Sequence, residues 1–227
     1  MVASQISNLP RRRVLAGGLA TVALALPGCA TMQRWSLVDA VRRLLERASG
    51  NALARLAAPG GFWDNQLARL DLPDVFGNRG TVLQNILTSM VFRDRLQREL
   101  NHVAERGARR AAPLVVDAVR VIGIDNAVAL IRGQPTAATG FLRQAMGGRL
   151  IDAMVPELGE GLRLASDPLV GQAIGALVGV DITGVARSLA VEAEDAIWGE
   201  IGREEAFIRA NPRATNDPLL IGVFGAL

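Results

Sequence analysis

The chain has 227 residues, and its composition already excludes some classes of protein. Half of the residues are hydrophobic, all 25 basic residues are arginine, and three of these arginines lie in residues 1–28, which hold no acid. Residues 29–227 therefore carry 22 arginines against 22 acidic residues. Because nucleic-acid binding needs an excess of clustered cations to neutralise phosphates, no nucleic-acid partner is predicted.

The first element is the string "RRRVLAGGLATVALALPGCA" at residues 11–30. Its apolar part, residues 14–26, is shorter than the ~20 residues that a helix needs to cross a bilayer. A charged start, a short apolar run and small residues before a cut are typical of a secretory signal peptide. We therefore expect residues 1–28 to be removed on export.

The end of this segment also resembles a bacterial lipoprotein signal, through Leu26, Gly28 and Cys29. The resemblance implies that Cys29 is lipidated and begins the mature chain, with residues 29–35 as a short tether. Thr31 stands where an aspartate would hold such a protein at the inner membrane, which favours the outer membrane, facing the periplasm. A buried cysteine in a cytosolic protein is the alternative.

Two export routes fit these arginines equally well. Arg11 and Arg12 fit a twin-arginine signal, which exports folded proteins, and the three arginines also fit an ordinary signal that exports unfolded chains.

Residues 36–227 are expected to fold as one compact all-α domain. Apolar residues recur at intervals of three and four over 36–58, with Ser36 as the helix cap, and again over 81–112. Pro113 is expected to kink or restart that helix. Residues 115–121 are rich in β-branched side chains, but no second strand-like run exists to pair with them, so they too are assigned to a helix. Further helices are expected at 125–131, 135–164, 168–177 and 183–209, with a short one near the end.

Four strings resemble the bacterial domain of unknown function 4197 family, many of whose members are predicted exported proteins or lipoproteins. They are "GGFWDNQLARLDLP" at 60–73, "LNHVAERGARRAAPLVVDAV" at 100–119, "GQPTAATGFLRQ" at 133–144 and "NPRATNDPLLIGVFG" at 211–225. One departure is Gly140-Phe141-Leu142-Arg143, where the family tends to have an aromatic pair before the arginine. The resemblance implies an exported helical domain and carries over no biochemical activity.

Candidate site residues are the polar positions inside these strings, which could serve structure or bind a ligand: Asn65, Thr136, Thr139, Arg143, Arg213, Thr215 and Asp217. Thr136 is expected to cap a helix, and 211–217 to form a turn. Arg143 and Arg213 are expected to meet carboxylates across the fold. The sequence predicts no cofactor.

Catalytic and metal chemistry find little support in the sequence. His102 is the only histidine, and lysine and tyrosine are absent, so most ways of activating a nucleophile are missing. The acids of residues 191–205 share neighbouring helical turns but lack the Glu-x-x-His spacing of di-metal bundles, which favours a polar helix face. No metal site is predicted.

Two functions remain open from the sequence. The first is a non-catalytic lipoprotein that is anchored to the membrane at Cys29 and binds an apolar ligand, a lipid or an envelope protein. The second is a carboxylate-dependent periplasmic hydrolase that uses Asp125, Asp217 or the acidic helix.

Overall fold

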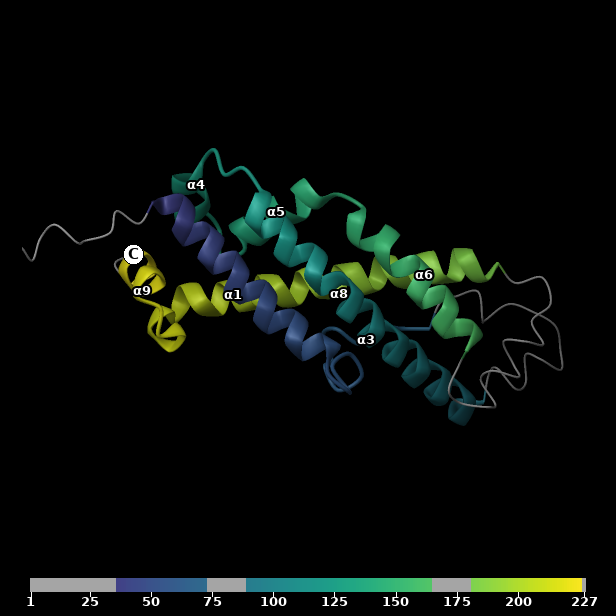
Figure 1. Ribbon diagram of the computed structural model, residues 1–227. Coiled ribbons are helices and arrows are strands. Elements are labelled where there is room, and N and C mark those ends of the chain that lie inside the picture. Colours follow the sequence, from purple (N-terminus) through teal and green to yellow (C-terminus); the bar gives the residue numbers. More distant parts are fainter. Residues whose placement is uncertain (1–35, 73–88, 165–180, 226–227) are drawn as a thin grey trace, which may run out of the picture. The chain divides into compact units, whose positions relative to one another are not determined.

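The computed structural model describes residues 36–72, 89–164 and 181–225 (Figure 1). Contacts between backbone positions divide the chain into residues 1–34 and one compact unit, Trp35–Leu227. The predicted signal, tether and Cys29 lie outside the described residues, as do the segment 168–177 and the first part of the segment 81–112.

The prediction of an all-α fold is confirmed, since the described residues form helices and no strand. The helices are α1 (Leu37–Ala57), α3 (Met90–Val121), α4 (Ala127–Arg132), α5 (Ala137–Met146), α6 (Arg149–Arg163), α8 (Ile182–Ala210), the 3₁₀ turn η3 (Pro212–Thr215) and α9 (Pro218–Phe224). None of the described helices combines the length and the apolar character needed to cross a membrane.

Four long helices build the core. Helices α3 and α8 each pack against both α1 and α6, so that the apolar stripe of each helix faces its neighbours (Figure 1). Fully buried leucines mark this core on all four helices, among them Leu44, Leu100, Leu158 and Leu189. At one end of the bundle, the short helices α4 and α9 pack against α1, and η3 packs against α8 and α9.

Helix α1 begins where the sequence predicted. The Ser36 hydroxyl accepts a hydrogen bond from the backbone N–H of Asp39 at 3.1 Å, and the Asp39 carboxylate accepts one from the Ser36 N–H at 3.2 Å. This is a reciprocal capping box. The hydrogen bonds from the Ser36 side chain and backbone lower the pKa of Asp39 below its usual value.

Of the two outcomes expected at Pro113, a kink or a restart, the restart is wrong, because α3 continues through this proline to Val121. Residues 115–121 are therefore helical, as predicted. Ala111, Val115 and Val119 are fully buried on one stripe that spans the proline, whereas Pro113 itself is exposed. Packing on both sides of Pro113 outweighs the one backbone hydrogen bond that proline removes, and Arg109, whose carbonyl loses this bond, is an exposed residue.

The single helix expected over residues 135–164 is instead two helices. Helix α5 ends at Met146, and α6 begins at Arg149. Gly147 lies between them with φ of 55°, a left-handed conformation that glycine adopts without the steric cost of a side chain. The break allows α5 and α6 to lie at different places along α8.

Candidate functional site

A buried ion pair in α8 organises the loop between α4 and α5. The Arg209 guanidinium lies 2.7 Å from the Glu205 carboxylate one helical turn earlier. The Glu205 side chain is fully buried, and only 10% of the Arg209 side chain is exposed. A buried charge is expensive unless it is paired and hydrogen-bonded, so the remaining bonds of this pair decide what it does.

Glu205 caps the N-terminus of α5 from outside that helix. Its carboxylate accepts hydrogen bonds from the backbone N–H groups of Ala138 at 3.0 Å and Thr139 at 2.6 Å, and from the Thr139 hydroxyl. The expectation that Thr136 caps this helix with its side chain is therefore wrong: Thr136 is at the cap position but makes no such bond. A full negative charge from α8 takes the place that favours an anion.

Arg209 closes the C-terminus of α4 in the same way. It donates to the backbone carbonyls of Ile131 and Leu130, each at 2.8 Å. Its guanidinium carbon also lies 4.9 Å from the centre of the Phe224 ring in α9. One ion pair thus binds the ends of two short helices and contacts the aromatic ring of a third.

Three predicted residues come together along α8. Thr136, Thr139 and Arg143 lie on one face of α5 and line a hollow of about 380 Å³ against α8. We call it the α5–α8 groove; from α8 it is lined by Trp198, Gly202 and Arg203, among others. A second hollow of about 410 Å³ adjoins the groove and shares Gly140 and Arg143 with it.

Arg143 is held by two acids of α8, as the sequence predicted for this arginine. It lies 2.7 Å from the buried Glu194 carboxylate and also pairs with Asp195. Burial alone would lower the pKa of Arg143, but the hydrogen bond and charge of Asp195 together with those of Glu194 raise it. The indole N–H of Trp198 also donates to Glu194. The charges of the groove are thus matched within the protein itself.

Asn65 belongs to a different cluster, between the loop after α1 and the other side of α8. Its amide donates to the Glu200 carboxylate at 2.6 Å, and Arg203 and Arg55 also contact Glu200. Burial would raise the pKa of Glu200, yet the hydrogen bonds from Arg203 and Asn65 and the nearby arginine charges lower it. Asn65 fixes the loop to α8.

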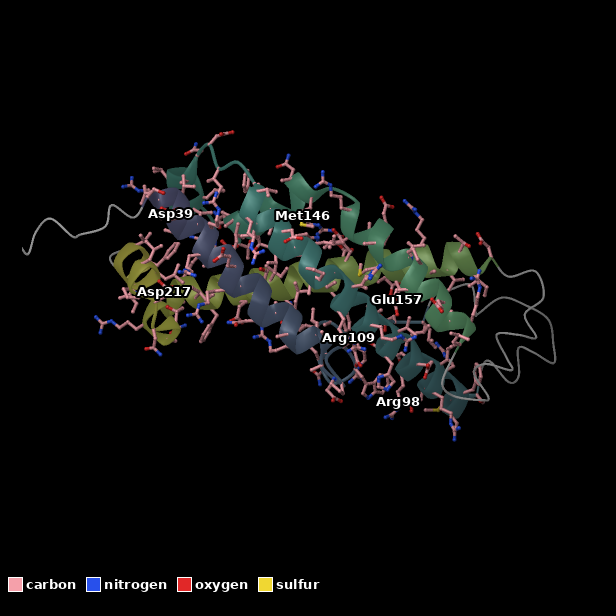
Figure 2. All side chains as sticks on the ribbon, viewed as in Figure 1. Asp39, Arg98, Arg109, Met146, Glu157 and Asp217 are labelled. Carbon is pink, nitrogen blue, oxygen red and sulfur yellow. The ribbon has the colours of Figure 1, made fainter. Side chains whose placement is uncertain are left out.

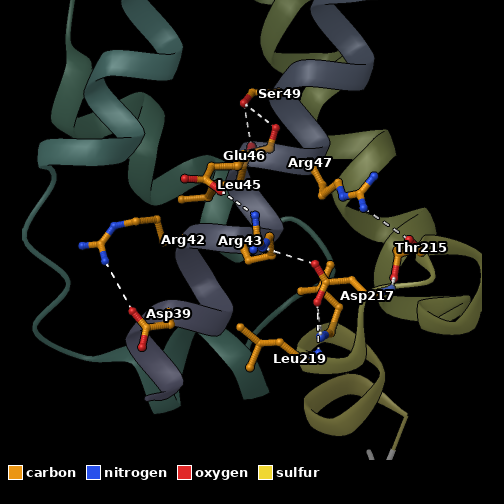
Figure 3. Close-up of polar contacts among 11 residues, drawn as sticks. Asp39, Arg42, Arg43, Leu45, Glu46, Arg47, Ser49, Thr215, Asp217 and Leu219 are labelled. Atoms are coloured by element: carbon orange, nitrogen blue, oxygen red, sulfur yellow. Dashed lines mark hydrogen bonds and ion pairs between the residues drawn. The ribbon is translucent and has the colours of Figure 1, made fainter. Parts of the chain in front are cut away.

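Thr215 and Asp217 form the corner that joins η3, α9 and α1 (Figure 3). Asp217 is the N-cap of α9 and accepts from the backbone N–H groups of Leu219 at 3.0 Å and Leu220 at 3.4 Å. Its second oxygen lies 3.2 Å from the Arg43 guanidinium of α1. The Thr215 hydroxyl donates to the Pro212 carbonyl and accepts from the Asp217 N–H. These are the bonds of a structural turn, as the sequence suggested.

Arg213 does not behave as expected. It is exposed, and no carboxylate of the described residues pairs with it. The 3₁₀ turn that contains Arg213 leaves this residue exposed, and Asp217 is paired by Arg43 instead. Figure 2 shows that Asp217 lies near one end of the described domain and Arg98 near the opposite end. The seven candidate residues do not converge on one site, because Asn65 contacts Glu200, Arg143 contacts Glu194, and Asp217 contacts Arg43.

Two substitutions at Asp217 distinguish its role as a helix cap from its ion pair with Arg43. Asp217→Ala removes the cap and should lower the free energy of unfolding by about 1–2 kcal/mol. Asp217→Asn keeps an oxygen that can cap the helix and loses only the charge facing Arg43, half of whose side chain is exposed, so about 0.5 kcal/mol or less is expected. Thermal denaturation measures both. A folded Asp217→Ala protein that keeps its melting temperature but loses a hydrolytic activity of the parent would contradict the structural role.

The acids of residues 191–205 are largely engaged by neighbouring side chains. Asp195 pairs with Arg143, Glu200 with Arg203, and Glu204 with Arg55 at 2.8 Å. Across the described ranges, no three His, Cys, Asp or Glu side chains form a group that could hold a metal ion. His102 is half exposed and lies 3.2 Å from Glu105, whose other oxygen accepts from the Gly60 N–H. His102 thus contacts a carboxylate that already holds the loop after α1 in place.

A third hollow, larger than the α5–α8 groove and the hollow that adjoins it, lies where α4, α8 and α9 meet. It measures about 600 Å³, and we call it the end pocket. Its lining is mainly apolar, and it consists of Ile131, Gly133, Pro135, Ala206, Ala210 and the Phe224 ring together with Arg132 and Arg209. Because Arg132 and Ala210 are exposed, the pocket reaches the surface. It shares Ala206 with the α5–α8 groove.

Sequence reasoning missed Glu205, Arg209 and the end pocket. Glu205 and Arg209 stand four residues apart in a charge-rich string, "REEAFIR", which looks like an ordinary solvated helix surface. One feature of the sequence could have identified Glu205. It shares a helical face with Ile201 and Ile208, which are both buried, so Glu205 occupies a core position.

Comparison with known proteins agrees with the four strings noted in the sequence. A family model described as "Protein of unknown function (DUF4197)" matches residues 31–225. No curated protein and no solved structure matches the chain. Because the family model covers nearly the whole chain, the protein belongs to the DUF4197 family.

Proposed function

We propose that the chain is an envelope lipoprotein that binds an apolar or amphipathic ligand in the end pocket and has no catalytic activity of its own. The observation that carries this proposal is the end pocket itself. Its volume of about 600 Å³ is within the range of ~300–1,000 Å³ that is typical of small-molecule sites. Its apolar lining with a few polar groups at the edge is also typical of such sites.

The bonds of the buried carboxylates support a binding protein over an enzyme. Glu194, Glu200 and Glu205 each accept hydrogen bonds from arginine and from a second donor. A carboxylate that serves as general acid or base needs a pKa near the working pH, usually raised by burial. The pKa of Glu200 is instead lowered, and the Asp217 carboxylate is bound as a helix cap, so both residues have structural roles in this proposal. Asp125, the third candidate acid, is exposed.

The proposed anchor at Cys29 gives the end pocket access to lipid. An extended chain spans at most about 3.5 Å per residue, so residues 29–35 would hold Ser36 within about 25 Å of the membrane. Helices α4 and α9, which form part of the end pocket, pack against α1 near its first turns (Figure 1). The end pocket therefore lies near Ser36, where the proposed tether joins the domain, and this supports a ligand drawn from the membrane.

Lipidation can be tested directly at Cys29. The parent chain expressed in a bacterial host should incorporate labelled fatty acid and fractionate with the outer membrane, and Cys29→Ser should do neither. Cleavage elsewhere, with Cys29 free as a thiol in the mature chain, would contradict the anchor.

Filling the end pocket tests the binding function. Ala210 is exposed and lines the pocket, so Ala210→Trp should place an indole in its opening and weaken binding of a neutral apolar dye, such as N-phenyl-1-naphthylamine, at least about tenfold. Fluorescence titration measures the affinity. Ala54→Trp is the matched control, since Ala54 is an exposed helical alanine outside the pocket. Equal affinity in both variants, or no binding by the parent, would refute the proposal.

A further inference from the structure

The end pocket has one polar feature that its apolar lining does not explain, the guanidinium of Arg132. Arg132 is the last residue of α4 and is exposed. Among the described residues no carboxylate lies within ion-pair distance of it. The cation therefore stands at the edge of an apolar pocket with its hydrogen-bonding capacity available.

The second arginine of the pocket is not available in this way. Arg209 directs its three nitrogens to Glu205 and to the carbonyls of Ile131 and Leu130. Glu205 neutralises its charge at 2.7 Å. Among the described lining residues, the end pocket thus offers one positive charge without a carboxylate partner, that of Arg132, whereas Glu205 balances the charge of Arg209.

The apolar part of the pocket extends away from this charge. Ile131 and Pro135 come from the α4–α5 region, Ala206 from α8 and the Phe224 ring from α9. None of these side chains carries a hydrogen-bonding group, so a ligand segment in contact with them gains only by removing apolar surface from water. A complementary ligand has a single anionic group joined to an apolar chain.

We propose that the ligand of the end pocket is a long-chain fatty acid, with its carboxylate on Arg132 and its chain against Ile131, Pro135 and Phe224. This inference rests on the proposed function and specifies its ligand. A planar guanidinium matches a carboxylate through two parallel hydrogen bonds, and one free cation matches one carboxylate. The small alanines of α8 leave the space that the chain occupies.

The experiment compares two ligands that share one chain and differ in the head group. Oleate and oleyl alcohol are titrated into the full chain below their aggregation limits, by displacement of the apolar dye. The parent should bind oleate about tenfold more tightly than the alcohol, the factor expected of one charge-assisted contact. This preference should fall at high salt, because an exposed charge is screened.

Two variants identify the residue responsible. Arg132→Gln should bind both ligands with the weaker affinity, and Arg163→Gln should keep the full preference. Arg163 is a fair control, since it is also the exposed last residue of its helix and has no carboxylate partner among the described residues.

The outcomes separate this inference from the proposed function. Equal binding of oleate and oleyl alcohol by the parent, with loss of both in Ala210→Trp, would leave the pocket standing and overturn the fatty acid. A preference that survives in Arg132→Gln, or tighter binding of a two-chain anionic phospholipid than of oleate, would also overturn it. Failure of every ligand and of the dye to bind would refute the binding function itself.

Discussion

Glu205→Gln should lower the free energy of unfolding by about 3–5 kcal/mol, the cost of removing one partner from a buried ion pair. The substitution keeps the shape of the side chain and removes its charge. Arg209, with 10% of its side chain exposed, then retains a positive charge without its partner. The N–H groups of Ala138 and Thr139 also lose a charged acceptor. Urea denaturation followed by circular dichroism measures the loss.

Asp94→Asn is the matched control for this substitution. Asp94 and Arg98 form an ion pair with the same four-residue spacing at 3.0 Å, but both side chains are about half exposed. Exposed pairs of this kind contribute about 0.5 kcal/mol or less. Similar losses of stability in both variants would mean that the Glu205–Arg209 pair does not stabilise the ends of α4 and α5 as a buried ion pair.

Gly61→Ala should destabilise the protein by about 2–3 kcal/mol, as expected where an added atom meets a packed backbone. A Cβ at Gly61 would lie 2.3 Å from the Arg55 carbonyl oxygen and 2.5 Å from that of Leu56. These are backbone atoms at the end of α1, so they cannot turn aside as a flexible side chain could. The loop that carries Asn65 to Glu200 would have to move.

Gly50→Ala serves as the control and should change stability in the opposite direction. Gly50 lies inside α1, and a Cβ there meets no atom within 4 Å. Replacing an unhindered helical glycine with alanine stabilises by about 0.5–1 kcal/mol. Thermal or urea denaturation of the two variants measures the direction of each change in stability. Stabilisation by both substitutions would contradict the close approach at Gly61.

The sequence predicted those parts of the fold that depend on local spacing. The stripes of α1 and α8 were visible at intervals of three and four, and Ser36 marked a helix start. The break at Gly147 was not, because residues on both sides keep helical spacing and only the packed structure selects a left-handed glycine there. The continuity of α3 through Pro113 likewise depends on packing.

The residues of the candidate site also divide into those that local spacing predicts and those that only the packed structure brings together. Thr136, Thr139 and Arg143 came together because residues three, four and seven apart share a helical face. Arg143 was also correctly expected to meet acids, whereas Arg213 was not distinguishable from it by sequence. Glu205 and Arg209 look like a surface pair until the ends of α4 and α5, more than 60 residues earlier, are brought against them.

The most direct test of the binding function is native mass spectrometry of the full chain purified from bacterial membranes in mild detergent. The parent and the Ala54→Trp control should carry a non-covalent adduct with the mass of a long-chain fatty acid, which is released on unfolding. Ala210→Trp should lack this adduct while keeping the helical circular dichroism of the parent. A parent protein without any bound ligand, or an adduct that Ala210→Trp retains in full, would contradict a ligand-binding end pocket.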